Sequence, residues 1–411
     1  MSKLIKVLNI SSYDLNSRKF NGYDWVSGLA QYGISSELLV LNKQSESKNV
    51  ETMSHANVIL RIFVKVLNRI NKRLNIRKEY VFGSRNVFRK NSYKNADVIH
   101  LHIVLDGTLD IETLERITKE KKVVWTWHDP SPTTGHCVTP MDCAEWITNC
   151  SNCPDLKRPI PIRNIRGLQS TEMKFDVASK ASLVHVSTNW MLSLISNHPN
   201  FSNIKLSKLS FGLDTNTFYP NRNHGLRKRL GIKDSEFVIG FRQTTDTYKN
   251  MKFILKYLES VETQQNLTIF TIGQTGLLEK YKTNPTFSII EFPWTNVDEE
   301  LRNYYNSLDV FISPSRFESF GFMPLEAMAC GTRVIGVTGS SVDEICELEK
   351  YGWRVQDGDT ESLVNLIKQI STEEFDETKR IEMVKFVQEK FDLNLFLKEL
   401  ARLYKEVYLE K

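Results

Sequence analysis

Two glutamates, Glu318 and Glu326, stand eight residues apart in the stretch of the sequence with the clearest chemical pattern. The residues after the first glutamate are expected at the N-terminus of a helix: Ser319, Phe320, Gly321 and Phe322. There the first backbone N–H groups have no partner within the helix, and the helix dipole adds partial positive charge. Both properties favour a phosphate group. We therefore expect a phosphate-bearing ligand beside these glutamates.

The elements that hold the two glutamates can be predicted from the same stretch. Residues 308–313 form a short apolar run with β-branched side chains, which is typical of a buried strand. Pro324 suits the first turn of a helix, and Gly331 is placed to end that helix. The sequence therefore predicts a strand, a loop and a helix in immediate succession.

Similar β-rich runs recur along the chain, with helical segments between them. They cover residues 4–10, 37–41, 96–103, 122–128, 182–187, 204–211, 236–242, 267–273, 287–292, 308–313 and 332–338. Strands that alternate with helices indicate parallel α/β layers. A chain of 411 residues also exceeds the size at which one hydrophobic core keeps growing.

These patterns predict two doubly wound, Rossmann-like α/β domains. We expect an N-terminal domain over residues 1–215, a C-terminal domain over 216–390, and a helix over 391–411 that packs back on the first domain. Ligands of open α/β sheets bind beyond the carboxyl ends of the strands. We therefore expect the two sheets to face each other across a ligand-binding cleft.

The composition is that of a soluble globular protein, with 41% hydrophobic and 25% charged residues. It excludes disordered, fibrous and membrane-spanning classes. No apolar run approaches the ~18 to 20 residues of a spanning helix, and residues 1–10 are too quickly interrupted for a secretory signal. We expect a cytoplasmic protein with reduced thiols.

Residues 61–90 carry an unusual charge pattern, with ten Lys or Arg residues and one acid, Glu79. Apolar residues recur among them at spacings of three and four, which predicts a basic amphipathic helix. Such a helix can lie on an anionic membrane surface. The alternative is a core-packed helix with a solvated basic face. No nucleic-acid-binding signature accompanies the charge, so we expect no nucleic acid partner.

The segment with the two glutamates resembles the paired-glutamate element of retaining glycosyltransferases of family 4, which have the two-domain GT-B fold. The flanking residues 309–332 and 340–345 fit the resemblance. It implies that Glu318 contacts the donor sugar and that Glu326 binds the ribose hydroxyls of the nucleotide. Carboxylates suit both tasks as charge-assisted acceptors. The alternative is a pair of surface acids favoured by the dipole at a helix start.

Residues 241–250 resemble the family's loop whose arginine and lysine hold the donor diphosphate, which assigns these roles to Arg242 and Lys249. Two fixed cations stabilise a departing diphosphate, so no cofactor is expected for catalysis. The spacing is longer than in the family, and Asn250 stands where glycine is usual. For Lys249 the alternative is an exposed lysine at a helix start.

In the N-terminal half, His128 ends a predicted strand, where the family places a histidine close to the transferred sugar. It could hydrogen-bond the donor sugar or position the acceptor hydroxyl, whereas the alternative is a structural histidine. His102 and Asp129 are further candidates on the acceptor side. Gly22 matches one of two adjacent glycines in the family's first loop and could permit close approach of the backbone.

Four cysteines lie within the seventeen residues of an insert at 137–153: Cys137, Cys143, Cys150 and Cys153. Four thiols at this density in a reducing compartment suit a structural zinc site. The alternatives are free thiols or disulfides. The block resembles a subgroup of colanic-acid-type and O-antigen glycosyltransferases. Cys330 and Cys346 are expected to be small core residues.

The resemblance implies transfer of a hexose-type sugar from a nucleotide-diphosphate sugar, with retained anomeric configuration. The implied acceptor is a growing, lipid-linked oligosaccharide of a surface polysaccharide such as lipopolysaccharide O-antigen or exopolysaccharide. The basic segment would then meet the inner face of the cell membrane as a peripheral contact. The rivals are a GT-B epimerase or phosphorylase and a catalytically silent subunit that binds a nucleotide sugar.

Overall fold

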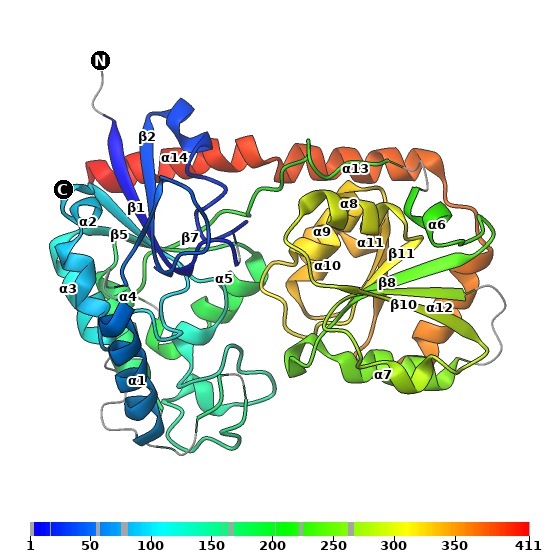
Figure 1. Cartoon of the computed structure of the whole chain (residues 1–411), viewed down its shortest axis with the longest axis horizontal. Helices are drawn as coiled ribbons and strands as arrows, with labels where there is room; N and C mark the ends of the chain where they lie inside the picture. The colour runs from blue at the N-terminus through cyan, green and yellow to red at the C-terminus, as the bar shows by residue number, and fades with distance from the viewer. Residues whose placement is uncertain are drawn as a thin grey trace. The chain divides into compact units, whose positions relative to one another are not determined.

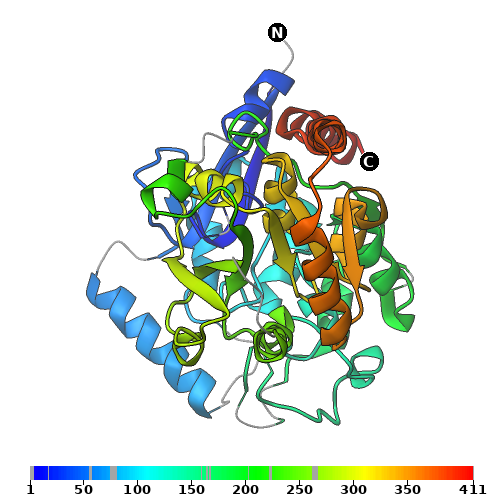
Figure 2. The same ribbon diagram turned by 90° about the vertical axis from the view of Figure 1, so that its right-hand side faces the viewer.

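The computed structural model describes residues 4–16, 18–54, 58–74, 81–158, 160–162, 165, 168–201, 203–221, 225–261 and 267–410. The chain forms two compact units (Figures 1 and 2). Unit 1 comprises Met1–Phe211 together with Asn394–Lys411, and unit 2 comprises Gly212–Leu393. The predicted boundaries lay after residues 215 and 390, close to the ends of these units.

Unit 1 contains a seven-stranded parallel sheet in the order β3-β2-β1-β4-β5-β6-β7. Its strands are β1 (Ile5–Tyr13), β2 (Ile34–Asn42), β3 (Val50–Thr52), β4 (Val98–Leu101), β5 (Lys122–Thr126), β6 (Leu183–Val186) and β7 (Leu206–Lys208). Its α-helices are α1 (Val58–Leu74), α2 (Asn91–Asn95), α3 (Ile111–Glu120), α4 (Thr171–Lys180), α5 (Asn189–Ser196) and α14 (Leu393–Leu409). The strand order reverses between β1 and β4, which is the switch point of this sheet.

Unit 2 contains a six-stranded parallel sheet in the order β10-β9-β8-β11-β12-β13. Its strands are β8 (Phe237–Gln243), β9 (Leu267–Gly273), β10 (Phe287–Pro293), β11 (Val310–Ser313), β12 (Arg333–Val337) and β13 (Gly352–Val355). Its α-helices are α6 (Gly225–Arg229), α7 (Met251–Ser260), α8 (Asp298–Asn306), α9 (Phe322–Ala329), α10 (Ser341–Cys346), α11 (Leu348–Tyr351), α12 (Thr360–Thr372) and α13 (Glu377–Phe391). Figure 1 shows α7 and α12 on one face of the sheet and α8 and α9 on the other. The switch point lies between β8 and β11.

The central strands are buried and largely apolar because helices cover both faces of each sheet. Every residue of β4, β6, β11 and β12 is buried. Each of the eleven predicted strands is present, and two short strands, β3 and β13, were not predicted. The predicted fold class of two doubly wound α/β domains is confirmed.

The C-terminal helix α14 packs within unit 1 through residues near its N-terminal end. The Phe396 ring lies 4.9 Å from the Trp25 ring in an edge-on arrangement. Leu397 lies so close to Gly28 that a Cβ at that glycine would be 2.5 Å from its Cδ1 atom. A side chain at position 28 would therefore push α14 away from the unit.

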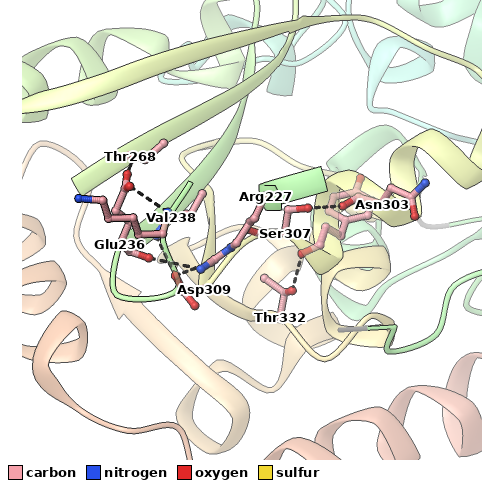
Figure 3. Close-up of polar contacts among 10 residues, drawn as sticks. Arg227, Glu236, Val238, Thr268, Asn303, Ser307, Asp309 and Thr332 are labelled. Atoms are coloured by element: carbon pink, nitrogen blue, oxygen red, sulfur yellow. Dashed lines mark hydrogen bonds and ion pairs between the residues drawn. The ribbon is translucent and has the colours of Figure 1, made fainter. Parts of the chain in front are cut away.

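A buried ion pair lies at the N-terminal ends of strands β8 and β11 in unit 2 (Figure 3). The Arg227 side chain, 4% exposed, contacts the Asp309 carboxylate with its Nη2 atom at 2.7 Å. Its Nε atom donates to the Ser307 carbonyl at 2.8 Å, and Nη1 donates to the Glu236 carbonyl at 3.3 Å. Asp309 also accepts a 2.8 Å hydrogen bond from the N–H of Val238 in β8. One guanidinium thus joins α6, β8 and the turn before β11.

Replacing Arg227 by methionine is expected to lower the free energy of unfolding of unit 2 by about 3 kcal/mol, because the Asp309 carboxylate and two backbone carbonyls, one of them buried, lose their partner. Urea unfolding followed by circular dichroism measures this. The control is Lys228→Met, which removes the same charge from an exposed position of the same helix. Equal unfolding midpoints for the two variants would contradict the prediction.

Candidate functional site

The loop between β11 and α9 carries the predicted phosphate-binding stretch. The helix begins at Phe322, two residues before Pro324, and Gly321 caps it with φ 93° and ψ 61°. A Cβ at Gly321 would lie 3.2 Å from Pro324 and 3.3 Å from Val342, so both the backbone conformation and the space favour glycine. The N–H of Ser341 donates to the Glu318 carbonyl at 3.2 Å and fixes the loop. The predicted order of strand, loop and helix is confirmed.

The structure brings together Lys249 and Glu318, which lie 69 residues apart in the sequence. The Lys249 Nζ atom is 2.5 Å from Glu318 Oε2, and the two side chains are only 17% and 19% exposed. Lys249 follows β8 and Glu318 follows β11, and these neighbouring strands flank the switch point. Lys249 is therefore not the exposed helix-start lysine that was the alternative.

Asn250 explains how the chain turns without the glycine that is usual here. Its backbone has φ 59° and ψ 40°, the left-handed conformation that Asn adopts more readily than most residues. Its side chain donates to Asp357 at 2.8 Å. The turn directs Lys249 back toward Glu318. Asn250 in place of glycine therefore keeps the left-handed backbone conformation that a glycine would adopt.

Arg242 lies near the end of β8, with its guanidinium carbon 4.9 Å from the centre of the Trp294 ring. Such stacking leaves the N–H groups at the edge of the guanidinium plane. The Arg242 Nε atom is buried and has no hydrogen-bond partner among the described residues. A buried donor without a partner favours an anionic ligand at this position.

Glu326 lies within α9 and is 2% exposed, so it is not the surface acid that was the alternative. The Tyr305 hydroxyl donates to its Oε2 atom at 2.6 Å. Burial and the neighbouring Glu326 charge raise the pKa of Tyr305 well above its ordinary value, so the hydroxyl keeps its proton and remains a donor. Tyr305 was not predicted, because nothing in the sequence pattern links it to a glutamate on the next helix.

In unit 1, the predicted residues His102 and His128 follow the neighbouring strands β4 and β5. The His102 Nδ1 atom is 3.2 Å from His128 Nε2. The His128 ring stacks on Phe211, with ring centres 5.5 Å apart and an angle of 13° between the planes. The His102 Nε2 atom lies 3.0 Å from the side-chain oxygen of Asn9 in β1. These contacts join the two histidines to the switch point of the sheet.

The hydrogen bonds determine which nitrogen of each histidine carries its proton. The Asn9 amide nitrogen donates to Ser36 and to the Glu37 carbonyl, so its oxygen must be the acceptor for His102 Nε2–H. His102 Nδ1 must then accept from the Nε2–H group of His128, so the proton of His128 lies on Nε2. The remaining nitrogen, His128 Nδ1, is a buried acceptor without a hydrogen-bond partner among the described residues.

Both histidines are neutral at physiological pH. Burial, reinforced by the His185 charge, lowers the pKa of His128 to about 3. Burial also lowers the pKa of His102 well below its ordinary value. His128 Nδ1 therefore presents a lone pair that can accept a hydrogen bond from a hydroxyl group of a ligand.

The structure gives one physical reason for glycine at position 22. Its φ of 96° is left-handed, and a Cβ there would lie 2.7 Å from Asn9 Cγ and 2.8 Å from its Oδ1 atom. Glycine at this position therefore leaves room for the Asn9 amide that orients His102. Close approach of the Gly22 backbone to a ligand stays a prediction.

Asp129, the residue after His128, accepts a 2.8 Å hydrogen bond from the N–H of Ser131. Burial raises the pKa of Asp129, and the charge of Asp106 raises it further, whereas the Ser131 hydrogen bond and Lys174 lower it. Burial also raises the pKa of Asp106, which follows β4. Asp106 was missed by the sequence reasoning, although it lies just beyond His102 in the loop after β4.

His100 and His185 form a separate hydrogen-bond network, although the centre of the His100 ring lies 4.0 Å from that of the His102 ring. His185 Nε2 donates to the Leu209 carbonyl at 2.7 Å, so its Nδ1 accepts from Thr126 at 2.9 Å. Thr126 in turn accepts from His100 Nε2 at 2.6 Å, and His100 Nδ1 accepts from the Tyr404 hydroxyl at 2.6 Å. Each member is paired, and the network fastens α14 to the sheet.

The four cysteines of the insert and His136 line one small cavity. His136 Nε2 lies 3.4 Å from the sulfur of Cys153 and 3.6 Å from that of Cys137. Cys150 accepts a 3.2 Å hydrogen bond from the Gly135 N–H. Burial raises the pKa of Cys137 to about 12, so this thiol is protonated when no metal is bound.

All six cysteines lie in the described ranges, and none of them forms a disulfide bond. Within the described ranges, no group of three or more His, Cys, Asp or Glu side chains is arranged to hold a metal ion. Structural zinc at Cys137, Cys143, Cys150 and Cys153 therefore stays a prediction. Cys330 and Cys346 are fully buried, as expected for small core residues.

Comparison with solved structures places the chain in the GT-B fold class. Sucrose-phosphate synthase from Thermosynechococcus elongatus aligns with a TM-score of 0.72 at 15% identity, covering 98% of this chain and 99% of that one. The Anabaena protein Alr3699/HepE in complex with UDP and glucose aligns with a TM-score of 0.65 at 13% identity, covering 98% and 100%. Residues 224–388, within unit 2, match the family Glycosyl transferases group 1.

Two relatives found by sequence comparison are named as glycosyltransferases. WcaC of Escherichia coli K12, inferred to be a colanic acid biosynthesis glycosyl transferase, is 22% identical over 306 residues, 70% of this chain and 71% of its own. The uncharacterized glycosyltransferase MJ1607 of Methanocaldococcus jannaschii is 25% identical over 185 residues, 44% of this chain. The chain spans 47% of the length of MJ1607. The similarity to colanic-acid glycosyltransferases that the sequence suggested is confirmed.

Proposed function

We propose that the protein is a retaining glycosyltransferase that moves a sugar from a nucleotide-diphosphate sugar to a growing, lipid-linked surface-polysaccharide or O-antigen oligosaccharide. The observation that carries this proposal is the Lys249–Glu318 ion pair beside the switch point of unit 2, where open α/β sheets bind ligands. The similarity to WcaC supports the substrate class. The HepE complex shows that one GT-B protein of similar fold binds UDP and glucose.

In the proposed reaction, Arg242 and Lys249 bind the diphosphate, Glu318 contacts the sugar, and Glu326 binds the ribose. The bond between the anomeric carbon and the diphosphate oxygen breaks. The acceptor oxygen bonds to the same face of that carbon and gives its proton to the departing diphosphate. Two fixed cations offset the charge that develops on the leaving group, so the proposal needs no metal ion.

In unit 1, the proposal assigns His128 Nδ1 the role of a hydrogen-bond acceptor. Its lone pair accepts a hydrogen bond from a hydroxyl group of the transferred sugar or of the acceptor. The buried, neutral state of the ring supports this role, because a cationic histidine would have no acceptor to offer.

A panel of UDP-, GDP-, ADP- and dTDP-sugars tests the donor part of the proposal by thermal unfolding. At about 100 times Kd, the correct donor is expected to add about 2.7 kcal/mol to stability and to raise Tm by roughly 5 to 10 °C. Lys249→Met is expected to lose most of this shift. Lys252→Met, on an exposed position of α7, is the matched control and is expected to keep it.

The outcomes separate the proposal from its rivals. Mass spectrometry detects transfer to an acceptor, and proton NMR of the product shows whether the anomeric configuration is retained. A thermal shift without transfer to any lipid-linked acceptor would support the silent subunit instead. Conversion of the nucleotide sugar into its epimer would support an epimerase, and an unshifted Tm with every donor would exclude the proposal.

A further inference from the structure

The helix α1 (Val58–Leu74) contacts the rest of unit 1 through one side only. Val64, Leu67, Asn68 and Asn71 on this side are half-buried. The Asn68 side chain donates to the Phe82 carbonyl at 3.1 Å and accepts from the Phe82 N–H at 2.8 Å. Figures 1 and 2 both show α1 at the periphery of its unit. The helix is therefore attached along a narrow strip.

The other side of α1 exposes five large apolar side chains. They are Ile59 at 78%, Ile62 at 58%, Phe63 at 56%, Val66 at 43% and Ile70 at 43% exposure. Their spacing of three and four residues places them on one stripe of the helix. At about 100° per residue, the centre of this stripe lies roughly 130° around the helix from the centre of the attached side. The alternative of a core-packed helix with a solvated basic face is therefore wrong for these residues.

Four basic residues lie along the flank of this stripe. They are Arg61, Lys65, Arg69 and Arg73, all exposed. None of the four forms an ion pair in the part of the chain that the structure describes, and residues 58–74 include no Asp or Glu. The uncompensated charge is complementary to an anionic surface.

The described helix is shorter than the predicted basic segment over 61–90. It ends at Leu74, residues 75–80 lie outside the described part of the chain, and Ser84–Arg89 forms a separate short 3₁₀ helix. Across the described residues, no helix is both long and apolar enough to cross a membrane. A contact of α1 with a lipid surface would therefore have the helix lying in the plane of the membrane and not crossing it.

We propose that α1 is a membrane-docking helix that inserts its exposed apolar stripe into the interface of an anionic bilayer. The basic flank contacts the lipid phosphates, and the Asn68 side holds the helix to unit 1. This geometry matches helices that lie in the plane of the interface. The inference rests on the proposed function in that a lipid-linked acceptor is presented at such a surface.

The test is cosedimentation of the full chain with vesicles of phosphatidylcholine containing 30% phosphatidylglycerol, and with pure phosphatidylcholine. Binding to the anionic vesicles is expected to exceed binding to neutral ones at least tenfold. Phe63→Ser with Val66→Ser is expected to weaken binding at least tenfold, since both apolar anchors are lost. Lys65→Gln with Arg69→Gln is expected to weaken it by roughly 25-fold, at about fivefold per basic residue.

The matched control is Ile381→Ser with Leu409→Ser, which removes two exposed apolar side chains from other helices and is expected to bind as the unchanged protein does. Equal binding by the control and the Phe63/Val66 variant would overturn the proposal. So would self-association through the stripe, seen by sedimentation velocity as a dimer that this variant abolishes. Because the nucleotide-sugar Tm shift does not depend on α1, its survival in the Phe63/Val66 variant separates failure of docking from failure of the proposed function.

Discussion

Replacing Glu318 by glutamine is expected to lower kcat about 10²- to 10³-fold, with a much smaller change in KM for the donor. Glutamine keeps the size of the side chain but loses the charge that pairs with Lys249 Nζ at 2.5 Å. As the sugar detaches from the diphosphate, positive charge grows on its ring, and a fixed carboxylate stabilises that charge only in the transition state. Interactions of this kind raise kcat and carry the magnitude given.

The measurement is steady-state transfer of a labelled sugar, with Glu361→Gln as the control because Glu361 is an exposed acid in the first turn of α12. The variant also leaves Lys249 mostly buried without its carboxylate, so some loss of thermal stability is expected. Bound diphosphate can supply the missing anion, and saturating donor is therefore expected to restore part of that stability. A variant that kept the original kcat would remove Glu318 from the reaction.

The strands were predictable because the sheets are parallel and covered on both faces, which makes each central strand a short, largely apolar run. Ile269 and Phe270 of β9, for example, are fully buried. The short strands β3 and β13 escaped because Glu51 and Arg354 interrupt their apolar pattern. Their pairing at the edges of the two sheets compensates for a weak local signal.

The charged candidates were predictable because they follow strands and lie in motifs that resemble a known family. Their partners were not, because these come from distant parts of the chain. Tyr305 is 21 residues from Glu326, and Asn9 is 93 residues from His102. For α1, periodicity gave an amphipathic helix, but it could not indicate that the stripe with Phe63 faces away from the unit. That depends on contacts such as Asn68 with Phe82.

Replacing His128 by phenylalanine is expected to lower kcat about 100-fold, the scale of losing one preorganised hydrogen-bonding group in an active site. The aromatic ring keeps the stacking on Phe211 but removes both nitrogens. His128→Asn is expected to retain more activity than His128→Phe, because the side-chain oxygen of asparagine can take the place of Nδ1. Equal activity of the two variants would indicate that packing, and not the acceptor, is what His128 contributes.

The pH dependence distinguishes a neutral acceptor from a titrating catalyst. With a folded-state pKa of about 3, His128 stays neutral through pH 5 to 8, so kcat is expected to show no ionisation of this residue in that range. In the unfolded chain its pKa returns to about 6.5, so the unfolded state binds the extra proton first. His128 therefore contributes stability that is present above pH 6.5 and is lost as the pH falls toward 3.

Urea unfolding at pH 7.5 and 5.0 is expected to show a smaller loss of stability on acidification for His128→Phe than for the unchanged protein. An equal loss of stability in the two proteins would contradict this expectation. So would a plot of kcat against pH that shows an ionisation near pH 6.5, if His128→Phe abolishes that ionisation. Either result would mean that His128 is protonated in the folded enzyme and that its Nδ1 cannot accept a hydrogen bond.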